Sequence, residues 1–295
     1  MTGPEPLRIR LHEDAALFRE AVNYTAAETA FAARLIEKDY FCTLLLGHLS
    51  MAEPALVFKG GTCLAKVHAG FYRLSEDLDF VIPVTAQTGR AERSRRVAEL
   101  KRVIVRLEQN IPAFRATTPL RGASNSTQYI ATVSYASLVA HQQDTIKVEI
   151  ALREPLLTAS IVGAAHTIIR NPVSGAPMIP VISVPSISQA EAMAEKLRAA
   201  LSRREVAIRD FYDVDYAVRH LGVNPKKQGL IDLVRQKLAV SGNELVDVSA
   251  DRMTALRSQL TTQLRPVLRS RDFDTFDLDR AIAIVTAVAA SLETA

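Results

Sequence analysis

The sequence has only two cysteines in 295 residues, Cys42 and Cys63. Two cysteines cannot build a disulfide framework or a cysteine-based zinc site, and their scarcity favours a reducing compartment. The six histidines are scattered and none forms a His-x-x-x-His pair, so we expect no zinc site of that kind. Glycine and proline number only 12 and 13, which excludes collagen-like and low-complexity chains.

Long apolar runs are also missing. No stretch reaches the about 18 apolar residues that a membrane-spanning helix needs, and the longest, over 281–290, is too short. The first ten residues lack an apolar segment behind a basic start, so we expect no signal peptide. The chain carries neither a Gly-x-x-x-x-Gly-Lys-Ser/Thr phosphate loop nor a dinucleotide-binding fingerprint. We therefore expect a cytoplasmic protein with no membrane partner.

The composition that remains is that of a globular protein, with 48% hydrophobic and 23% charged residues. Its length favours about two domains. The pattern changes after Pro185, from mixed strands and helices to helices alone. We expect an α/β fold with a helical lead-in and a mixed-sheet core over 1–185, followed by a helical domain over 186–295.

Hydrophobic periodicity and turn residues define the expected elements. They are helices within 13–50, a strand over 55–58, a helix over 62–68, a strand over 78–84, a helix over 90–109, strands over 128–139 and 145–152, and helices near 188–203, 205–221, 227–240, 250–264 and 276–292.

Positive charge is concentrated in one segment. The formal net charge is +4, and residues 90–108 alone hold seven arginines and lysines against three glutamates, which is 7 − 3 = +4. On a helix, Val97, Leu100 and Ile104 would form an apolar face and leave the arginines outside it. The basic face is either an ordinary solvated surface or a surface that follows the phosphates of RNA.

The most informative segment is a glycine pair followed by an acid pair. Gly60-Gly61 lies between an expected strand and an expected helix, where free N–H groups favour phosphate. Asp77 and Asp79 are two apart on the next strand, so both carboxylates point to one face. Two such carboxylates favour a cation between them, and hard oxygen ligands suit Mg²⁺. A pair of Mg²⁺ ions could activate a hydroxyl and stabilise a leaving pyrophosphate.

The tripeptide Asp-Leu-Asp occurs a second time, at 277–279. No glycine pair precedes that copy, and it lies at an expected helix start, where acidic residues favour the helix dipole. We interpret the second copy as a helix start only.

A third carboxylate is available on the strand over 145–152. Its residues alternate, so Lys147 and Glu149 share one face and the isoleucines and valine share the other. Glu149 would complete a metal-binding triad with Lys147 beside it. The alternative is a cross-strand salt bridge on a half-exposed sheet.

These residues resemble known sequence signatures. A glycine pair followed by Asp-x-Asp resembles the polymerase-β-type nucleotidyltransferase superfamily. The sequence motifs are most similar to those of one branch of this superfamily, the AbiEii/AbiGii toxin family, which includes the MenT toxins. The matching blocks are Glu37-Lys38-Asp39-Tyr40, residues 58–66, Ser75-Glu76-Asp77-Leu78-Asp79, Ala194-Glu195-Lys196-Leu197-Arg198-Ala199 and Arg209-Asp210-Phe211-Tyr212-Asp213-Val214.

The resemblance implies a nucleotidyltransferase core, an NTP substrate, divalent metal and a helical C-terminal domain. It also implies a toxin that transfers nucleotides to RNA, notably the 3′ end of tRNA, and that is paired with a cognate antitoxin. Two hydroxyls common in the family are replaced here, by Cys63 and Ala65, while Thr62 remains. The third acid is Glu149, where many polymerase-like enzymes use Asp.

Carried over residue by residue, the resemblance assigns the triphosphate to Gly60, Gly61 and Thr62 with Lys66 nearby, and the metal to Asp77 and Asp79. It also assigns the phosphates to Lys196 and the nucleotide or acceptor to Asp210 and Asp213. The strand alternation adds Glu149 as the third metal ligand, with Lys147 beside the cofactor. A surface network of ion pairs is the plain alternative for Lys196, Asp210 and Asp213. Ser75 would lie at the mouth of the site, where its hydroxyl could accept a phosphoryl or nucleotidyl group or simply form a turn.

Two other functions remain open on the sequence. The same chemistry could modify a small molecule or a protein side chain instead of RNA. A chain with this fold could also be a non-catalytic module that binds RNA or an antitoxin. The intact pair Asp77 and Asp79 and the matching Lys196 favour catalysis, and the basic segment favours RNA.

Overall fold

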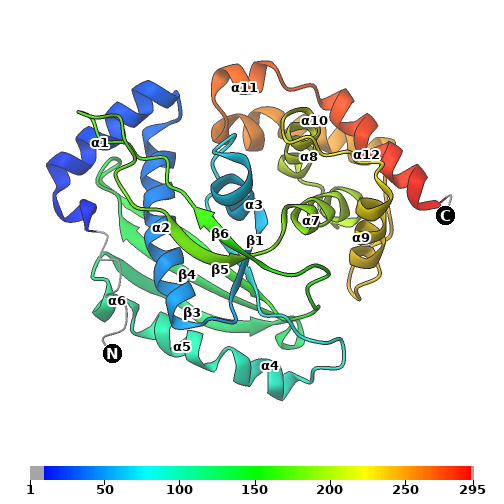
Figure 1. Ribbon diagram of the computed structural model, residues 1–295, viewed down its shortest axis with the longest axis horizontal. Helices are drawn as coiled ribbons and strands as arrows, with labels where there is room; N and C mark the ends of the chain where they lie inside the picture. The colour runs from blue at the N-terminus through cyan, green and yellow to red at the C-terminus, as the bar shows by residue number, and fades with distance from the viewer. Residues whose placement is uncertain (1–9, 294–295) are drawn as a thin grey trace. The chain divides into compact units, whose positions relative to one another are not determined.

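The computed structural model describes residues 10–293 and divides the chain into two compact units. The first unit runs to Pro155 and resumes over Ile161–Ser186, and the second consists of Leu156–Ser160 and the chain from Ile187 onward. Strands and their covering helices make up the first unit, and helices make up the second (Figure 1). The expected α/β class is confirmed.

The strands of the first unit form one mixed sheet. Within residues 10–293 it has seven strands in the order β3-β4-β5-β2-β1-β7-β6. The pairs β1–β7 and β2–β5 are parallel, and the other neighbours are antiparallel. Their bounds are β1 Val57–Lys59, β2 Leu78–Val81, β3 Phe114–Ala123, β4 Gln128–Ala136, β5 Gln143–Ala151, β6 Ile161–Ala165 and β7 Ile182–Ser186.

Strand β3 was not expected from the sequence. It contains Pro119 and Gly122, both of which are depleted in strand interiors. Proline has no N–H for a neighbouring strand and is confined to edge strands. Strand β3 is an edge strand, and its register with β4 shifts on either side of Thr118. An edge strand with an irregular register can accommodate Pro119 and Gly122.

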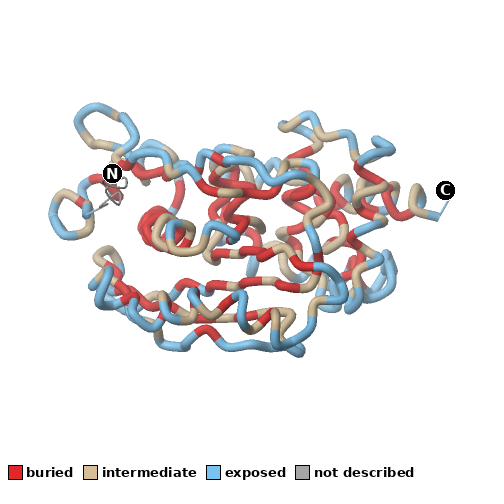
Figure 2. Tube along the Cα trace, turned by 60° about the horizontal axis from the view of Figure 1, so that its bottom comes forward, coloured by how far each residue is buried: buried red, intermediate tan, exposed pale blue. Residues whose placement is uncertain are grey.

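One face of the sheet forms the core of the first unit. Helices α1 (Ala15–Thr29) and α2 (Ala33–Ala52) precede the sheet in the chain. Phe41 of α2 stacks on Tyr135 of β4 with 4.1 Å between ring centroids. Leu78 and Phe80 of β2 are buried on that face, as their alternation with Asp77 and Asp79 predicts. Figure 2 shows buried residues along the interior segments and exposed ones in the connecting loops.

The basic segment is three short helices and not one long one. Helices α4 (Arg90–Arg96), α5 (Ala98–Val105) and α6 (Leu107–Asn110) are separated at Val97 and Arg106, whose backbones are not helical. Lys101 of α5 lies 5.0 Å from the ring centroid of Tyr129, which points to the same face of β4 as Tyr135. The segment therefore covers the core face of the sheet, opposite to the face of Asp79.

Two short helices complete the first unit around the glycine pair. The α-helical turn α3 (Gly60–Cys63) continues directly into a π-helical segment over Leu64–Ala69. This matches the helix expected over 62–68.

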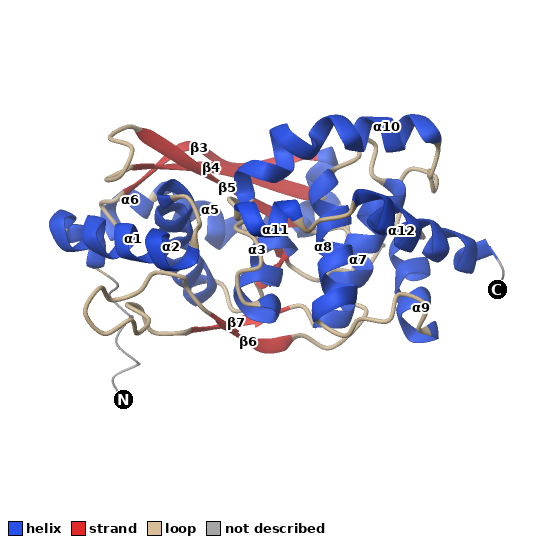
Figure 3. Ribbon diagram, turned by 90° about the horizontal axis from the view of Figure 1, so that it is seen from above, coloured by secondary structure: helices blue, strands red, loops and turns tan. Residues whose placement is uncertain are grey.

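The second unit consists of helices joined by loops (Figure 3). Its helices are α7 Gln189–Ser202, α8 Ile208–His220, α9 Gln228–Leu238, α10 Ala250–Gln259, α11 Ser270–Asp274 and α12 Leu278–Glu293. The five helices expected there are confirmed within a few residues, and the short α11 is additional. Asp277 accepts a hydrogen bond from the backbone N–H of Arg280 at 3.0 Å, so the second Asp-Leu-Asp copy is a helix start, as predicted.

Among the described residues, no helix has both the length and the apolar character that crossing a membrane requires.

Candidate functional site

The glycine pair and the acid pair meet where β1 ends. Gly60 follows β1 with a φ of +76°, a left-handed conformation that turns the chain into α3. A β-carbon added at Gly60 would lie 2.8 Å from Cβ and from Cγ of Asp79. Only glycine leaves room for the Asp79 side chain here, so the 19-residue gap between them in sequence closes to van der Waals contact.

A buried arginine lies behind Gly61. A β-carbon at Gly61 would lie 2.6 Å from Nη2 of Arg73 and 3.2 Å from Oγ of Ser75. Arg73 is 2% exposed, and its Nη1 donates to the carbonyl oxygen of Leu74 at 3.4 Å. Sequence reasoning did not identify Arg73. Its guanidinium places a positive charge directly against the backbone that is expected to hold a triphosphate.

The carboxylates occupy neighbouring strands on the face of the sheet opposite α5. Asp79 is the register partner of Lys59 in β1 and of Glu149 in β5. Asp77 directly precedes β2, and its carbonyl oxygen accepts a hydrogen bond from the Thr62 hydroxyl. The sheet thus brings the three predicted acids into one region and attaches Thr62 to the same segment.

Lys147 lies among these carboxylates. Its Nζ is 2.7 Å from Oε2 of Glu149, and Gln128 donates to the other oxygen of Glu149 at 2.5 Å. Burial raises the pKa of Glu149, but these two partners outweigh it and hold the pKa below its usual value. Burial lowers the pKa of Lys147, and the carboxylates of Glu149, Asp77 and Asp79 outweigh that effect and raise it.

Asp77 behaves differently from Glu149. Burial raises the pKa of Asp77 above its usual value, and the nearby charges of Lys147 and Lys38 offset that only in part. A second cation close to Asp77 would stabilise its charged form. The hard oxygen donors of Asp77 and Asp79 fit Mg²⁺ in this respect.

A complete metal cage is not preformed. Within residues 10–293, no group of three or more histidine, cysteine or acidic side chains is arranged to hold a metal ion. Glu149 pairs with Lys147 of its own strand and accepts from Gln128 of β4, so its salt bridge runs along the strand and not across strands as the alternative interpretation expected. Its role as third metal ligand stays a prediction.

Lys66 points into the protein. Its Nζ is 2.5 Å from Oδ1 of Asp39 and 2.6 Å from Oγ1 of Thr43, both on α2, and the side chain is 1% exposed. These contacts attach the segment after the glycine pair to α2. The predicted contact of Lys66 with the triphosphate stays a prediction, and the contacts observed are structural. Cys63 is fully buried, which agrees with its interpretation as a packing residue.

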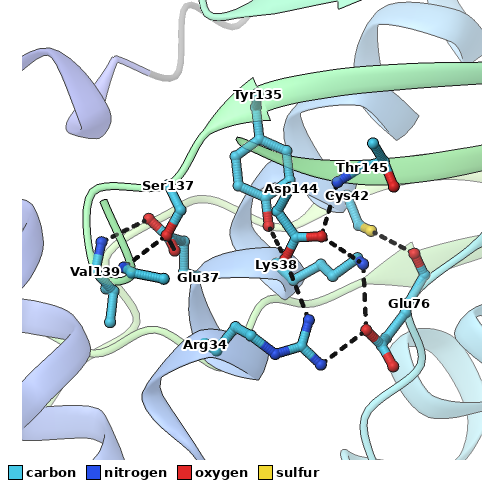
Figure 4. A network of polar contacts seen from close by, with 11 residues as sticks. Arg34, Glu37, Lys38, Cys42, Glu76, Tyr135, Ser137, Val139, Asp144 and Thr145 are labelled. Atoms are coloured by element: carbon cyan, nitrogen blue, oxygen red, sulfur yellow. Dashed lines mark hydrogen bonds and ion pairs between the residues drawn. The ribbon is translucent and has the colours of Figure 1, made fainter. Parts of the chain in front are cut away.

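A second network joins α2 to the two strands beside Asp77 (Figure 4). Lys38 contacts Glu76 at 3.2 Å and Asp144 at 3.1 Å, and Arg34 contacts the same two carboxylates at 3.1 Å each. Glu76 directly precedes Asp77, and Asp144 lies at the start of β5. Lys38 therefore bridges the segment that leads into Asp77 and the start of β5, the strand that carries Lys147 three residues after Asp144.

In the second unit, helices α7 and α8 bring Lys196, Asp210 and Asp213 together. Nζ of Lys196 is 2.9 Å from Oδ1 of Asp210 and 2.8 Å from Oδ2 of Asp213. Arg203 contacts the other oxygen of Asp210 at 3.3 Å. Asp210 and Asp213 share one helix face, as their spacing predicts, and both are buried. Their roles toward a nucleotide stay predictions.

The family profile described as "Nucleotidyl transferase AbiEii toxin, Type IV TA system" matches residues 44–284 of this chain. The chain belongs to the AbiEii toxin family. This match spans most of the chain and both units, and it confirms the resemblance drawn from the glycine and acid pairs.

Two solved structures are similar to this chain. The crystal structure of JHP933 from Helicobacter pylori is 16% identical, with a TM-score of 0.51 over 89% of this chain and 95% of that chain. A candidate nucleotidyltransferase from H. pylori is 17% identical, with a TM-score of 0.47 over 93% and 96% of the two chains. The first shows a shared fold. Comparison with curated proteins gave no match.

Replacing Gly60 tests the contact between the glycine pair and Asp79. Gly70 is a matched control, because its φ is +67° and nothing lies within 4 Å of an added β-carbon. We expect Gly70→Ala to cost about 1–2 kcal/mol from the left-handed backbone alone. Gly60→Ala adds the collision with Asp79 and costs about 1–3 kcal/mol more. Urea unfolding of both variants measures the difference, and equal losses would contradict the contact.

Replacing Lys38 tests the network beside Asp77. Its side chain is 8% exposed and that of Arg34 is 42% exposed, so Arg34→Met is the control. Lys38→Met leaves two half-buried carboxylates without their shared ammonium and is expected to cost about 3–5 kcal/mol at pH 7. Arg34→Met is expected to cost about 0–1 kcal/mol. Urea unfolding midpoints measure both costs.

The loss of unfolding free energy caused by Lys38→Met should become smaller as pH falls. Burial raises the pKa of Glu76 and of Asp144, but Lys38, Arg34 and the Thr145 N–H outweigh it, so both pKa values lie below their usual range. The stabilisation is present above the unfolded-state pKa of about 4 and is lost as pH falls through the lower folded-state values. The difference in free energy of unfolding between wild type and Lys38→Met should therefore become smaller below about pH 4. A difference independent of pH would contradict this origin.

Proposed function

We propose that this chain is the toxin of a toxin–antitoxin pair, and that it transfers nucleotides from NTP to RNA, specifically to the 3′ end of tRNA, and thereby blocks translation. Membership of the AbiEii family supports nucleotidyl transfer and an antitoxin partner. The observation that carries the proposal is the contact between Gly60 and Asp79, which unites a backbone suited to phosphate with a pair of acids.

The chain's own residues supply distinct parts of the reaction. The backbone N–H groups of the Gly60–Gly61 turn, backed by the guanidinium of Arg73, would bind the triphosphate. The hydrogen bond from the Thr62 hydroxyl to the carbonyl oxygen of Asp77 connects the glycine turn to the segment of the acids. The 3′-hydroxyl of the acceptor attacks the α-phosphorus of the NTP, and the bond to the β-phosphate breaks to release pyrophosphate.

Asp77 and Asp79 would hold Mg²⁺, which supplies charge neutralisation at the phosphates and activation of the attacking hydroxyl when bound. Lys147, among the carboxylates, and Lys59, the register partner of Asp79, are suited to stabilise the departing pyrophosphate. The family resemblance assigns Lys196 to the phosphates and Asp210 and Asp213 to the nucleotide or acceptor. We retain those assignments as part of the proposal, with the reaction placed in the cytoplasm, where NTP and tRNA are present.

The proposal predicts labelling of tRNA that depends on Asp77. Purified protein is incubated with Mg²⁺, each α-labelled NTP in turn and total tRNA. We expect Asp77→Asn to lower label on tRNA by at least about 100-fold while its unfolding curve stays close to that of wild type. Asp279→Asn, which changes the exposed second Asp-Leu-Asp copy, is the control and should label like wild type.

Three outcomes would contradict parts of the proposal. Full activity of Asp77→Asn would refute the site. Pyrophosphate release with label on a small molecule or on protein would refute RNA as the acceptor. No turnover of any NTP would favour a non-catalytic binding module.

A further inference from the structure

The face of the sheet that carries Asp79 and Glu149 continues across two more strands to the edge strand β3. Strand register places side chains of β5, β4 and β3 in rows on this face. The three rows are Glu149–Ile130–Arg121, Lys147–Thr132–Thr118 and Thr145–Ser134–Arg115. Each row therefore leads from the neighbourhood of the acids to β3, and two of them end on an arginine.

Both arginines are exposed and available. Among residues 10–293, neither the Arg115 nor the Arg121 guanidinium makes an ion pair or a hydrogen bond. The arginines of the basic segment are mostly engaged by contrast: Arg93 donates to the carbonyl oxygen of Asn125 at 3.0 Å, and Arg96 contacts Glu92 at 3.0 Å. Two exposed guanidinium groups on an otherwise uncharged edge of the sheet are free to contact an anionic partner from outside this part of the chain.

Hydroxyl side chains are common between the arginines and the acids. The middle residues of two rows are the half-buried Thr132 and the buried Ser134, and Ile130 is in the middle of the third. Thr118 and Thr145 are exposed hydroxyl residues at row ends. Hydroxyl groups and guanidinium groups are the donors that commonly contact sugar and phosphate oxygens. The same face supplies both, beside the acids of the proposed reaction centre.

The dimensions fit the end of a single strand. Strand β3 lies three strand spacings from β2, which is about 14 Å. At about 3.4 Å per stacked nucleotide, that distance holds about four nucleotides. A terminal hydroxyl near Asp77 and Asp79 would thus leave phosphates about four nucleotides inward beside β3.

We propose that the surface formed by Arg115, Thr118, Arg121 and Thr132 binds the sugar–phosphate backbone of the single-stranded 3′ segment of the acceptor RNA. This inference rests on the proposed function, because it assigns that reaction its acceptor-binding surface. The charge gradient favours RNA over an acidic protein. Within residues 10–293, the guanidinium groups of the rows that have no partner lie at the β3 end, where backbone phosphates would be. At the other end Lys147 is paired with Glu149, and the carboxylates lie where an uncharged hydroxyl must arrive.

The basic helices are not part of this path. Helices α4, α5 and α6 lie together beside the sheet (Figure 1), and the contact of Lys101 with Tyr129 places α5 on the opposite face. Their exposed Arg90 and Arg106 have no ion-pair or hydrogen-bond partner for their guanidinium groups within residues 10–293. The pair Arg90 and Arg106 therefore matches Arg115 and Arg121 in charge and exposure and differs in the face it occupies.

The test compares the double variants R115Q/R121Q and R90Q/R106Q with wild type, using total tRNA and the preferred NTP. We expect R115Q/R121Q to raise the KM for tRNA by about 10-fold or more, with the KM for NTP unchanged. The slope of log affinity for tRNA against log salt should fall by about 1.4, which is two phosphates at about 0.7 each. R90Q/R106Q should leave both quantities within about 2-fold of wild type, and R115K/R121K should recover most of the salt slope because it keeps the charge.

The outcomes separate this inference from the proposed function. If wild type labels no RNA, the proposed function fails and the inference fails with it. If wild type labels tRNA and R115Q/R121Q keeps the wild-type KM and salt slope, the inference alone is overturned. Loss of antitoxin binding by R115Q/R121Q with unchanged tRNA kinetics would overturn it in favour of an acidic protein partner.

Discussion

The close approach of the Asp79 side chain to Gly60 is the constraint on which the candidate site depends. Antiparallel pairing of β1 with β2 places Asp79 opposite Lys59, one residue before the turn. The side chain can occupy that position only because Gly60 has no β-carbon and adopts a positive φ. Burial of Leu78 and Phe80 on the reverse face keeps Asp79 pointing toward the glycine. Packing of Leu78 and Phe80 in the core thus fixes the orientation of the Asp79 carboxylate.

Two buried lysines, Lys66 after the glycine turn and Lys38 of α2, connect this region to helix α2. Lys66 binds Asp39 and Thr43 behind the glycine turn, and Lys38 binds Glu76 and Asp144 beside the acid pair. Each ammonium is desolvated and compensated by well-placed oxygens, which is the condition under which a buried ion pair is tolerated. The two networks hold the turn and the acids to one rigid helix, and such support keeps catalytic groups within a narrow range of geometry.

Much of the fold followed from the sequence where periodicity was undisturbed. The helices of the second unit and the strands β4 and β5 were expected, because each shows an uninterrupted helical or alternating pattern. Strand β3 was missed because Pro119 and Gly122 argue against a strand, and only its place at the sheet edge permits them. The basic segment was expected as one helix, since its periodicity continues through Val97 and Arg106, where the backbone departs from helical geometry.

The part of the candidate site that depends on strand alternation was predicted from the sequence, and the part that depends on contacts between distant segments was not. Spacing placed Asp77 and Asp79 on one face of their strand and Glu149 beside Lys147 on one face of its own strand, because each depends only on strand alternation. That these faces coincide depends on the pairing of β2 with β5. Spacing could not show that Lys66 turns inward to Asp39 or that Arg73 lies behind Gly61, since both depend on contacts between distant segments. Spacing also could not show which face of the sheet the basic helices cover, because that depends on the contact between Lys101 and Tyr129.

The central claim is that the Gly60 turn and the acid pair form one nucleotide-binding centre. The most direct test is a crystal structure of the protein with Mg²⁺ and an NTP whose α,β-bridge cannot be cleaved. The account predicts metal between the carboxylates of Asp77 and Asp79, with the triphosphate against the N–H groups of Gly60 and Gly61. A triphosphate bound elsewhere, or one whose metal is held without Asp77 and Asp79, would contradict it.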